Sequence, residues 1–137
     1  MRTAIPAALL GCVAALALAA MPATAFPFDV RLQAPNHHPK GGAKDWRITV
    51  TARTASGKPL RATAVYHFLY GGRVVSTQYP NPGRARGGSR PYAFRGRYSD
   101  TILWPKRAAG YRLTFRVAVT VRGKGTVNRD WWVRVRR

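Results

Sequence analysis

Apolar and polar residues alternate along the C-terminal stretch from Tyr111 to Arg137, with one interruption at Gly123-Lys124-Gly125. Strict alternation is typical of a β-strand that buries one face, and a short glycine-containing break between two such strands is typical of a hairpin. The pattern therefore predicts an antiparallel hairpin with a three-residue loop in which Gly125 is left-handed. One face of the first strand then enters the core. That face consists of Leu113, Phe115, Val117 and Val119.

The turn also sets the register of the hairpin. Pairing Arg122 with Thr126 places Arg116 opposite Trp132, where a guanidinium over an indole contributes about 0.5–1 kcal/mol at an exposed site. A register shifted by two residues would instead pair Arg116 with Asp130. In either register the solvent face carries four arginines, which are Arg112, Arg116, Arg134 and Arg136.

Five further strands are expected upstream of the hairpin, and turn residues separate them. They span residues 28–32, 46–53, 62–70, 73–77 and 98–104. Gly71-Gly72 joins two of them as a tight hairpin, and no segment after the N-terminal one has a helical period. Seven short strands predict an all-β fold, an antiparallel β-sandwich, as a single domain over residues 26–137.

The N-terminal segment has the pattern of a signal peptide. Met1-Arg2-Thr3 precedes a long uncharged stretch, which ends at Ala23-Thr24-Ala25, a small-x-small cleavage signature. We expect residues 1–25 to be removed after Ala25, leaving a secreted or envelope-associated protein. Two alternatives are lipidation at Cys12 and an uncleaved membrane anchor, because the stretch approaches the roughly 20 residues that span a bilayer.

The charge of the chain is strongly unbalanced. It has 24 basic residues against four acidic ones, a net charge of +20, and Arg outnumbers Lys 19 to 5. Such a charge attracts polyanions and repels other cations. We therefore expect the mature protein, at +19 after loss of Arg2, to associate with an anionic envelope polymer or another polyanion.

The densest group of cations lies between residues 81 and 97, where arginines alternate with glycines and flank two aromatic residues. The arginines are Arg84, Arg86, Arg90, Arg95 and Arg97, and the aromatic residues are Tyr92 and Phe94. Guanidinium groups bind phosphate or carboxylate with two hydrogen bonds, and nearby aromatic rings, with Trp132 of the hairpin as a third, stack on bases or sugars. In an exported protein the expected targets are envelope polymers, lipid headgroups or extracellular DNA. The alternative is a flexible, solubilising loop whose Tyr92 and Phe94 cover the edge of the sandwich.

In the order of its strands and corners the chain resembles an immunoglobulin-like or fibronectin-like module of exported bacterial proteins. The resemblance covers most of residues 28–137 and is carried by the final hairpin and by two corners, Gly57-Lys58-Pro59 and Pro105 to Gly110. Tyr111 is similar in placement to the tyrosine corner of such domains, whereas their inter-sheet cysteines are absent. The resemblance implies an antiparallel immunoglobulin-like β-sandwich of about seven strands that serves in adhesion, display or packing.

Residues for catalysis or metal binding are sparse. The four carboxylates are scattered, the mature chain has no cysteine, and no serine lies in a nucleophile elbow. His37-His38 is a candidate metal-binding pair, but adjacent histidines beside Pro39 are more typical of a solvated loop. We therefore expect no enzymatic activity, no cofactor, no metal and no specific small-molecule ligand.

Two functions remain open at this point. The first is a cationic binding or adhesion module that attaches to anionic polymers. The second is a structural or accessory module that docks a protein partner through apolar strand surfaces and uses its charge only for solubility.

Overall fold

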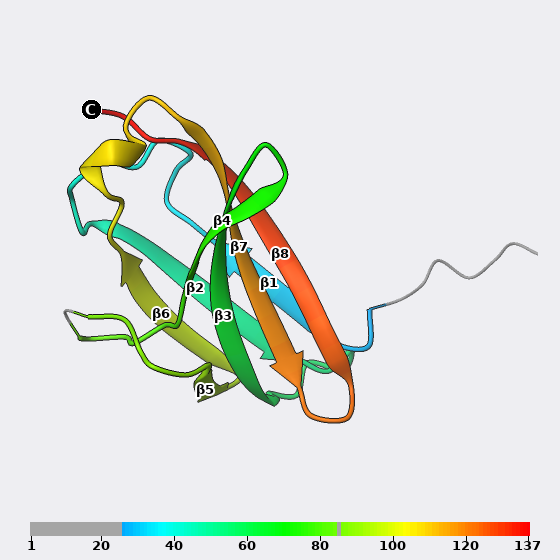
Figure 1. Cartoon of the computed structure of the whole chain (residues 1–137). Coiled ribbons are helices and arrows are strands. Elements are labelled where there is room, and N and C mark those ends of the chain that lie inside the picture. The colour runs from blue at the N-terminus through cyan, green and yellow to red at the C-terminus, as the bar shows by residue number, and fades with distance from the viewer. Residues whose placement is uncertain (1–25, 85) are drawn as a thin grey trace, which may run out of the picture.

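The computed structural model describes residues 26–84 and 86–137, which form eight β-strands and one 3₁₀ turn (Figure 1). The strands are β1 (Asp29–Gln33), β2 (Trp46–Arg53), β3 (Arg61–Tyr70), β4 (Arg73–Gln78), β5 (Tyr92–Arg95), β6 (Arg97–Ile102), β7 (Arg112–Val121) and β8 (Gly125–Arg134), and the 3₁₀ turn is η1 (Lys106–Ala108). The predicted signal peptide, with Cys12, lies outside the described residues.

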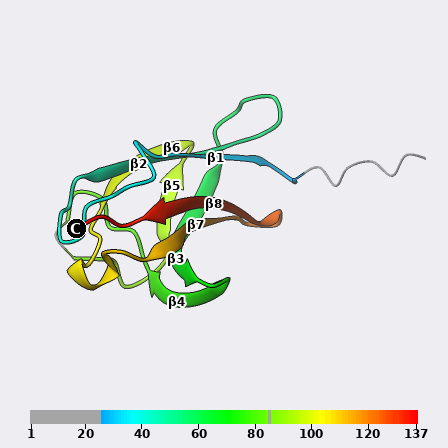
Figure 2. The same cartoon turned by 90° about the horizontal axis from the view of Figure 1, so that it is seen from above.

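The strands form two antiparallel sheets that lie one above the other (Figure 2). One sheet has the order β1-β2-β6, and the other has the order β4-β3-β7-β8. β7 pairs along one edge of β3, while β5 and β4 share its other edge, β5 along Arg61–Ala64 and β4 along Tyr66–Tyr70. The prediction of an all-β fold with two antiparallel sheets is confirmed. The strand count is eight rather than about seven, because β5 lies in the segment predicted as a loop.

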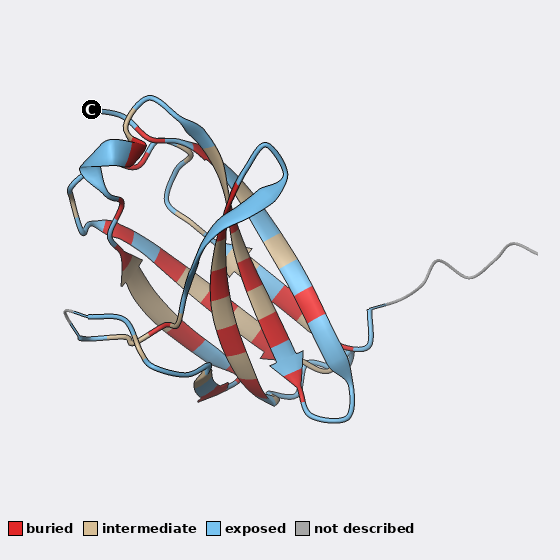
Figure 3. Ribbon diagram, viewed as in Figure 1, coloured by how far each residue is buried: buried red, intermediate tan, exposed pale blue. Residues whose placement is uncertain are grey.

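The apolar side chains of the predicted alternating pattern fill the space between the two sheets. Buried and less buried residues alternate along β7 (Figure 3). Phe115, Val117 and Val119 are fully buried, and Leu113 is partly buried against them. Phe115 lies in an aromatic cluster, where it has ring-centroid distances of 5.0–6.3 Å to Trp46, Tyr66, Phe68 and Trp104. Burying one such side chain stabilises the fold by about 1.5–3 kcal/mol. In the described part of the chain no charged residue is buried, so the cations there lie on the surface.

The register of the hairpin is shifted by two residues from the one that we predicted with Arg122 opposite Thr126. Val121 pairs with Gly125, which makes Arg122, Gly123 and Lys124 the loop. The cause is a β-turn, in which Lys124 N donates to Val121 O at 2.9 Å and Gly123 takes the third position with φ +78°. Gly125 also has a positive φ, +92°, as predicted.

The shift changes the neighbours of each side chain but not the face on which it lies, because strand side chains alternate with a period of two. Arg116 is opposite Asp130, so the predicted contact between Arg116 and Trp132 is wrong. Arg112 is opposite Arg134, and its guanidinium lies over the Trp132 ring instead, 5.1 Å from the centroid.

The segment after β1 covers one edge of the larger sheet. After pairing with β2, the chain runs beside the end of β8, where Arg134 N donates to His37 O and Arg136 N donates to Pro39 O, both at 2.8 Å. The edge of β8 is therefore covered in this region. The opposite edge of the sheet is β4, whose outer side has no strand partner within residues 26–84 and 86–137.

Tyr111 does not form the expected tyrosine corner. Its side chain is 52% exposed and its ring lies edge-on to Tyr70 at 5.8 Å, and its hydroxyl makes no hydrogen bond to any residue that the structure describes. Backbone bonds hold this corner instead: Gly110 N donates to Val135 O at 2.7 Å, and Val135 N donates to Tyr111 O at 3.1 Å.

Candidate polyanion-binding sites

The arginine-rich segment between residues 81 and 97 is divided into separate structural parts. Its first part is a turn closed by a bridge between Tyr79 and Gly88, within which Asn81 Nδ2 donates to Arg86 O at 3.1 Å. Its last part forms β5, which carries Arg95, and the start of β6, which carries Arg97. The expectation of one flexible loop is therefore wrong, and the five arginines belong to different surfaces.

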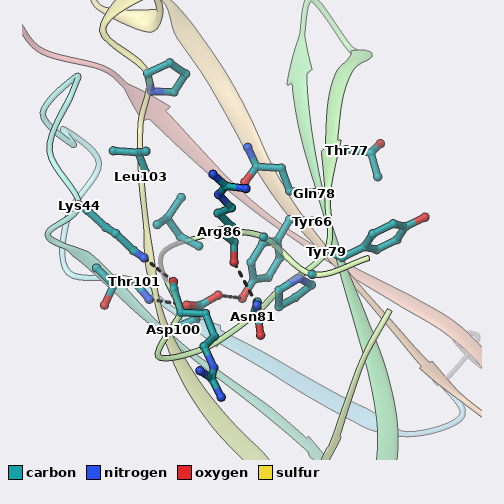
Figure 4. A pocket seen from close by; sticks show the side chains of 16 residues that line it. Lys44, Tyr66, Thr77, Gln78, Tyr79, Asn81, Arg86, Asp100, Thr101 and Leu103 are labelled. Carbon is teal, nitrogen blue, oxygen red and sulfur yellow. Dashed lines mark hydrogen bonds between the residues drawn. The ribbon is translucent and has the colours of Figure 1, made fainter. Parts of the chain in front are cut away.

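Arg84 and Arg86 lie on the wall of an open cleft of about 420 Å³ at the edge of the sandwich, which we call the edge cleft (Figure 4). Its walls include the turn from Tyr79 to Gly88, residues of β3, β4 and β6, and Lys44. The Lys44 ammonium donates to Arg84 O at 2.8 Å, which connects the loop before β2 to the turn. The cleft thus presents three cationic side chains together with a single carboxylate, Asp100.

Asp100 belongs to a chain of hydrogen bonds that joins the two sheets. Tyr98 donates to the Tyr66 hydroxyl at 3.1 Å, Tyr66 donates to Asp100 Oδ2 at 2.9 Å, and Thr101 N donates to Asp100 Oδ1 at 2.8 Å. Burial raises the pKa of both tyrosines well above the usual value, so the two phenols remain neutral at physiological pH. Asp100 therefore has a structural role as the acceptor for Tyr66, while the cations around it remain available for a ligand.

A second group of cations lines a shallow groove of about 610 Å³ on the larger sheet, which we call the arginine groove. Arg61 of β3 is directly opposite Arg95 of β5, and Arg122 of the hairpin loop lines the same groove. The other lining residues are Ala62, Thr63, Ala93, Phe94 and Thr120, so the groove contains no carboxylate. Like charges directly opposite each other destabilise a sheet, and an anion bound between them would remove that repulsion.

The aromatic residues predicted to stack on a ligand are largely occupied by other parts of the chain. Phe94 is buried, with its ring 4.7 Å from that of Tyr98, and Tyr92 lies 5.0 Å from the same ring. These two residues cover the edge of the sandwich, as the alternative interpretation expected. Trp132 is 42% exposed, but its ring contacts His37, with 4.1 Å between ring centroids, in addition to Arg112.

The arginine face predicted on the hairpin is only partly available. Arg116 donates to both oxygens of Asp130, at 2.7 and 3.0 Å. The carboxylate offsets the positive charge of Arg116, and these hydrogen bonds raise the pKa of its guanidinium. Arg136 lies beyond β8 and donates to His38 O at 3.0 Å. Arg112 and Arg134 remain as an exposed pair of opposed cations on the face itself. Arg90 and Arg97 are exposed but line neither the edge cleft nor the arginine groove.

Sequence reasoning missed Lys44, Arg61 and Arg122 as partners of the predicted arginines. Each lies in a different segment from the arginines that it joins, so only the pairing of strands and turns brings them together. The alternation in β3 could have placed Arg61 at the start of a strand, but not opposite Arg95.

The histidines form a packing element. The ring of His37 is parallel to those of both Trp131 and Trp132, with centroid distances of 4.5 and 4.1 Å, and its Nδ1 lies 2.6 Å from Trp132 O. Over residues 26–84 and 86–137 there is no group of three or more His, Cys, Asp or Glu side chains that could hold a metal ion. In the same residues, no helix has the length and apolar character needed to cross a membrane.

A scan against protein-family models, a search of curated proteins and a search of solved structures each gave no significant match to this chain.

Proposed function

We propose that this chain is an exported, non-enzymatic, immunoglobulin-like β-sandwich module that binds anionic polymers of the cell envelope. Binding occurs through arginines and lysines that the sheets and turns hold at the edge cleft and the arginine groove. No cofactor takes part, and selectivity among anionic polymers is low because guanidinium groups recognise phosphate and carboxylate alike.

The observation that carries the proposal is the lack of neutralising partners for these cations. Among the described residues there are only two ion pairs, Arg31 with Asp29 and Arg116 with Asp130. Arg61 and Arg95 are instead opposite each other, and so are Arg112 and Arg134. If the charge served only solubility, cations scattered over the surface would be enough. Pairs of arginines held opposite each other on adjacent strands lower the stability of the sheet, because like charges repel. Such an arrangement is typical of a binding surface, where stability and function conflict.

The immunoglobulin-like part of the proposal is supported by the order of the strands. The chain crosses between the sheets after β2, after β5 and after β6, and a pair of sheets connected in this way is typical of immunoglobulin-like sandwiches. The segment after β1 also contacts both sheets, since β1 pairs with β2 and residues 37–39 then bond to the end of β8.

Export is proposed from the first 25 residues. N-terminal sequencing of protein recovered from the culture medium or envelope should begin at Phe26. A retained Met1 or a lipid on Cys12 would contradict this processing.

Polymer binding is tested with three variants that each lose three positive charges. The groove variant replaces Arg61, Arg95 and Arg122 with Gln, and the cleft variant replaces Lys44, Arg84 and Arg86. The control variant replaces Lys58, Arg73 and Arg137, which are exposed and line neither site. Affinity for an anionic envelope polymer and for duplex DNA is measured at several salt concentrations.

Each phosphate contact contributes about 0.9 to the slope of log K against log salt on duplex DNA. We expect the groove variant and the cleft variant each to lose about two to three units of this slope, and the control variant to lose less than about one. Equal losses in all three variants would mean that net charge alone attracts the polymer and would contradict the assigned sites. No binding by the wild type at low salt would overturn the proposal.

A further inference from the structure

β4 is an exposed and only weakly protected sheet edge. All six of its residues are exposed, including Val74 at 51% and Val75 at 60%. An edge strand presents unpaired N–H and C=O groups to any strand that approaches, and proteins usually block such edges with charges, prolines, bulges or covering segments. β4 has a bulge, where its register on β3 shifts between Phe68 and Leu69, and one charge, Arg73.

Two of the other sheet edges are protected more strongly. The end of β8 is covered by residues 37–39, and β6 carries Asp100 on its inward side, a charge that discourages pairing with another strand. β4 therefore offers an additional strand less resistance than either of these two edges.

An apolar groove of about 390 Å³ begins at β4 and extends across β3 to the start of β7. Its walls include Tyr70, Val75, Tyr111 and Leu113, and Tyr70 and Tyr111 are both more than half exposed. Strand addition gains affinity from main-chain hydrogen bonds and specificity from a pocket for alternate side chains. β4 and this apolar groove supply both components.

The positive charges near β4 favour a partner segment of opposite charge. A second copy of the mature chain would bring another net charge of +19, and none of the four aspartates lies on β4 or in the apolar groove. Arg73 begins the strand and Arg107 lines the groove. A partner segment with carboxylates on one face and apolar side chains on the other would satisfy both the cations and the groove.

We propose that β4 docks an extended segment of an acidic protein partner by strand addition, with apolar side chains of the segment at the end of the groove that Val75 lines. This surface shares no residue with the arginine groove, and it shares only Pro105 and two residues of β4, Thr77 and Gln78, with the edge cleft. The inference therefore does not depend on polymer binding.

The probe is a capped heptapeptide in which Val and Glu alternate, added to the mature protein while backbone amide NMR signals are recorded. We expect shifts concentrated on residues 73–78. One control peptide has the same sequence with alternate backbone nitrogens methylated, and a second has Lys in place of Glu. Each should bind at least about tenfold more weakly, because the first cannot complete the ladder and the second meets like charge.

Two protein variants separate strand addition from charge attraction. Val75→Lys fills the groove while adding a positive charge, and Gln33→Lys adds the same charge on β1, in the other sheet. Strand addition predicts about tenfold weaker binding by the first variant only, whereas charge attraction predicts tighter binding by both. Equal binding of the methylated peptide, shifts confined to the arginines, or no binding would overturn the proposal. Concentration-dependent shifts of residues 73–78 without peptide would identify a second copy as the occupant and would also overturn it.

Discussion

Phe115 is the residue on which the core of this sandwich depends most directly. It is fully buried and lies among aromatic rings from both sheets. We expect Phe115→Ala to lower the free energy of unfolding by about 3–5 kcal/mol, because it removes apolar contacts and leaves a cavity. Phe26→Ala is the matched control: this side chain is 60% exposed and has Arg129 over its ring, so its loss should cost about 1 kcal/mol or less. Urea denaturation measures both, and a loss below about 1 kcal/mol for Phe115→Ala would mean that its inward position is wrong.

The two buried phenols make stability depend on pH at the alkaline end. Burial raises the pKa of Tyr66 and Tyr98 in the folded state, while both ionise near their ordinary value of about 10 when unfolded. Below this pH both states are neutral and the phenols add no pH dependence. Above it the unfolded state releases protons that the folded state retains, so the free energy of unfolding should fall as the pH rises.

Tyr98→Phe tests this dependence. The variant loses one hydrogen bond, to the Tyr66 hydroxyl, at a cost of about 1 kcal/mol near neutral pH. It also has one buried phenol fewer, so its stability should decline less steeply above pH of about 10. Urea midpoints across this range measure the slope, and Tyr70→Phe, at an exposed tyrosine, is the control. Equal slopes in the wild type and Tyr98→Phe would contradict the assignment.

Individual strands show what alternation can and cannot predict. Alternation placed Phe115, Val117 and Val119 on the buried face because burial depends only on the parity of each position. The register depended on which residues of the Arg122–Lys124 region formed the turn, and two glycines with positive φ allowed two solutions that keep the same faces. The pattern did not identify β5, because this strand has four residues and lies between two glycine- and arginine-rich stretches. Tyr92 and Phe94 therefore resembled ligand contacts in a loop.

The pairing of β3 with β5 predicts that one substitution increases the stability of the fold, whereas most substitutions decrease it. Arg95 is exposed and directly opposite Arg61, and no acidic residue lines their groove. Replacing Arg95 with Gln should therefore stabilise the fold by about 0.2–1 kcal/mol, because it removes a like-charge pair. The same change should weaken binding of anionic polymer. Arg73→Gln, an exposed arginine that lines neither the groove nor the edge cleft, should leave polymer affinity nearly unchanged. Denaturation and polymer titration of both variants measure the two effects, and a destabilised Arg95→Gln would show that Arg61 and Arg95 do not repel each other in the folded state.

At the scale of the whole molecule, the sequence predicted the class of fold and the excess of charge, but not how the charge is distributed. Strand propensity and turn residues are local properties, so they identify most strands directly. Arg61 and Arg122 are far from Arg95 along the chain, and all three line one groove only because β3 pairs with β5 on one edge and with β7 on the other. The edge cleft likewise requires Lys44 and the turn from Tyr79 to Gly88 to meet beside β6. These contacts between distant segments are what the sequence pattern could not supply.

The net charge predicts how the stability of the whole domain responds to salt. A charge of +20, with two ion pairs among the described residues, makes repulsion between cations the dominant electrostatic interaction in the folded state. Sodium chloride shortens the screening length from about 30 Å at about 0.01 M to about 8 Å at about 0.15 M, so the free energy of unfolding should rise over this range. The variant with both Arg61→Gln and Arg95→Gln should be more stable at low salt and should gain less from added chloride, because two of the opposed charges are gone. Urea denaturation at each salt concentration measures the gain. A free energy of unfolding that falls with salt in the wild type would mean that attraction within ion pairs outweighs repulsion between cations. In that case the unpaired arginines would not repel one another strongly, and an anionic polymer bound to them would not stabilise the fold.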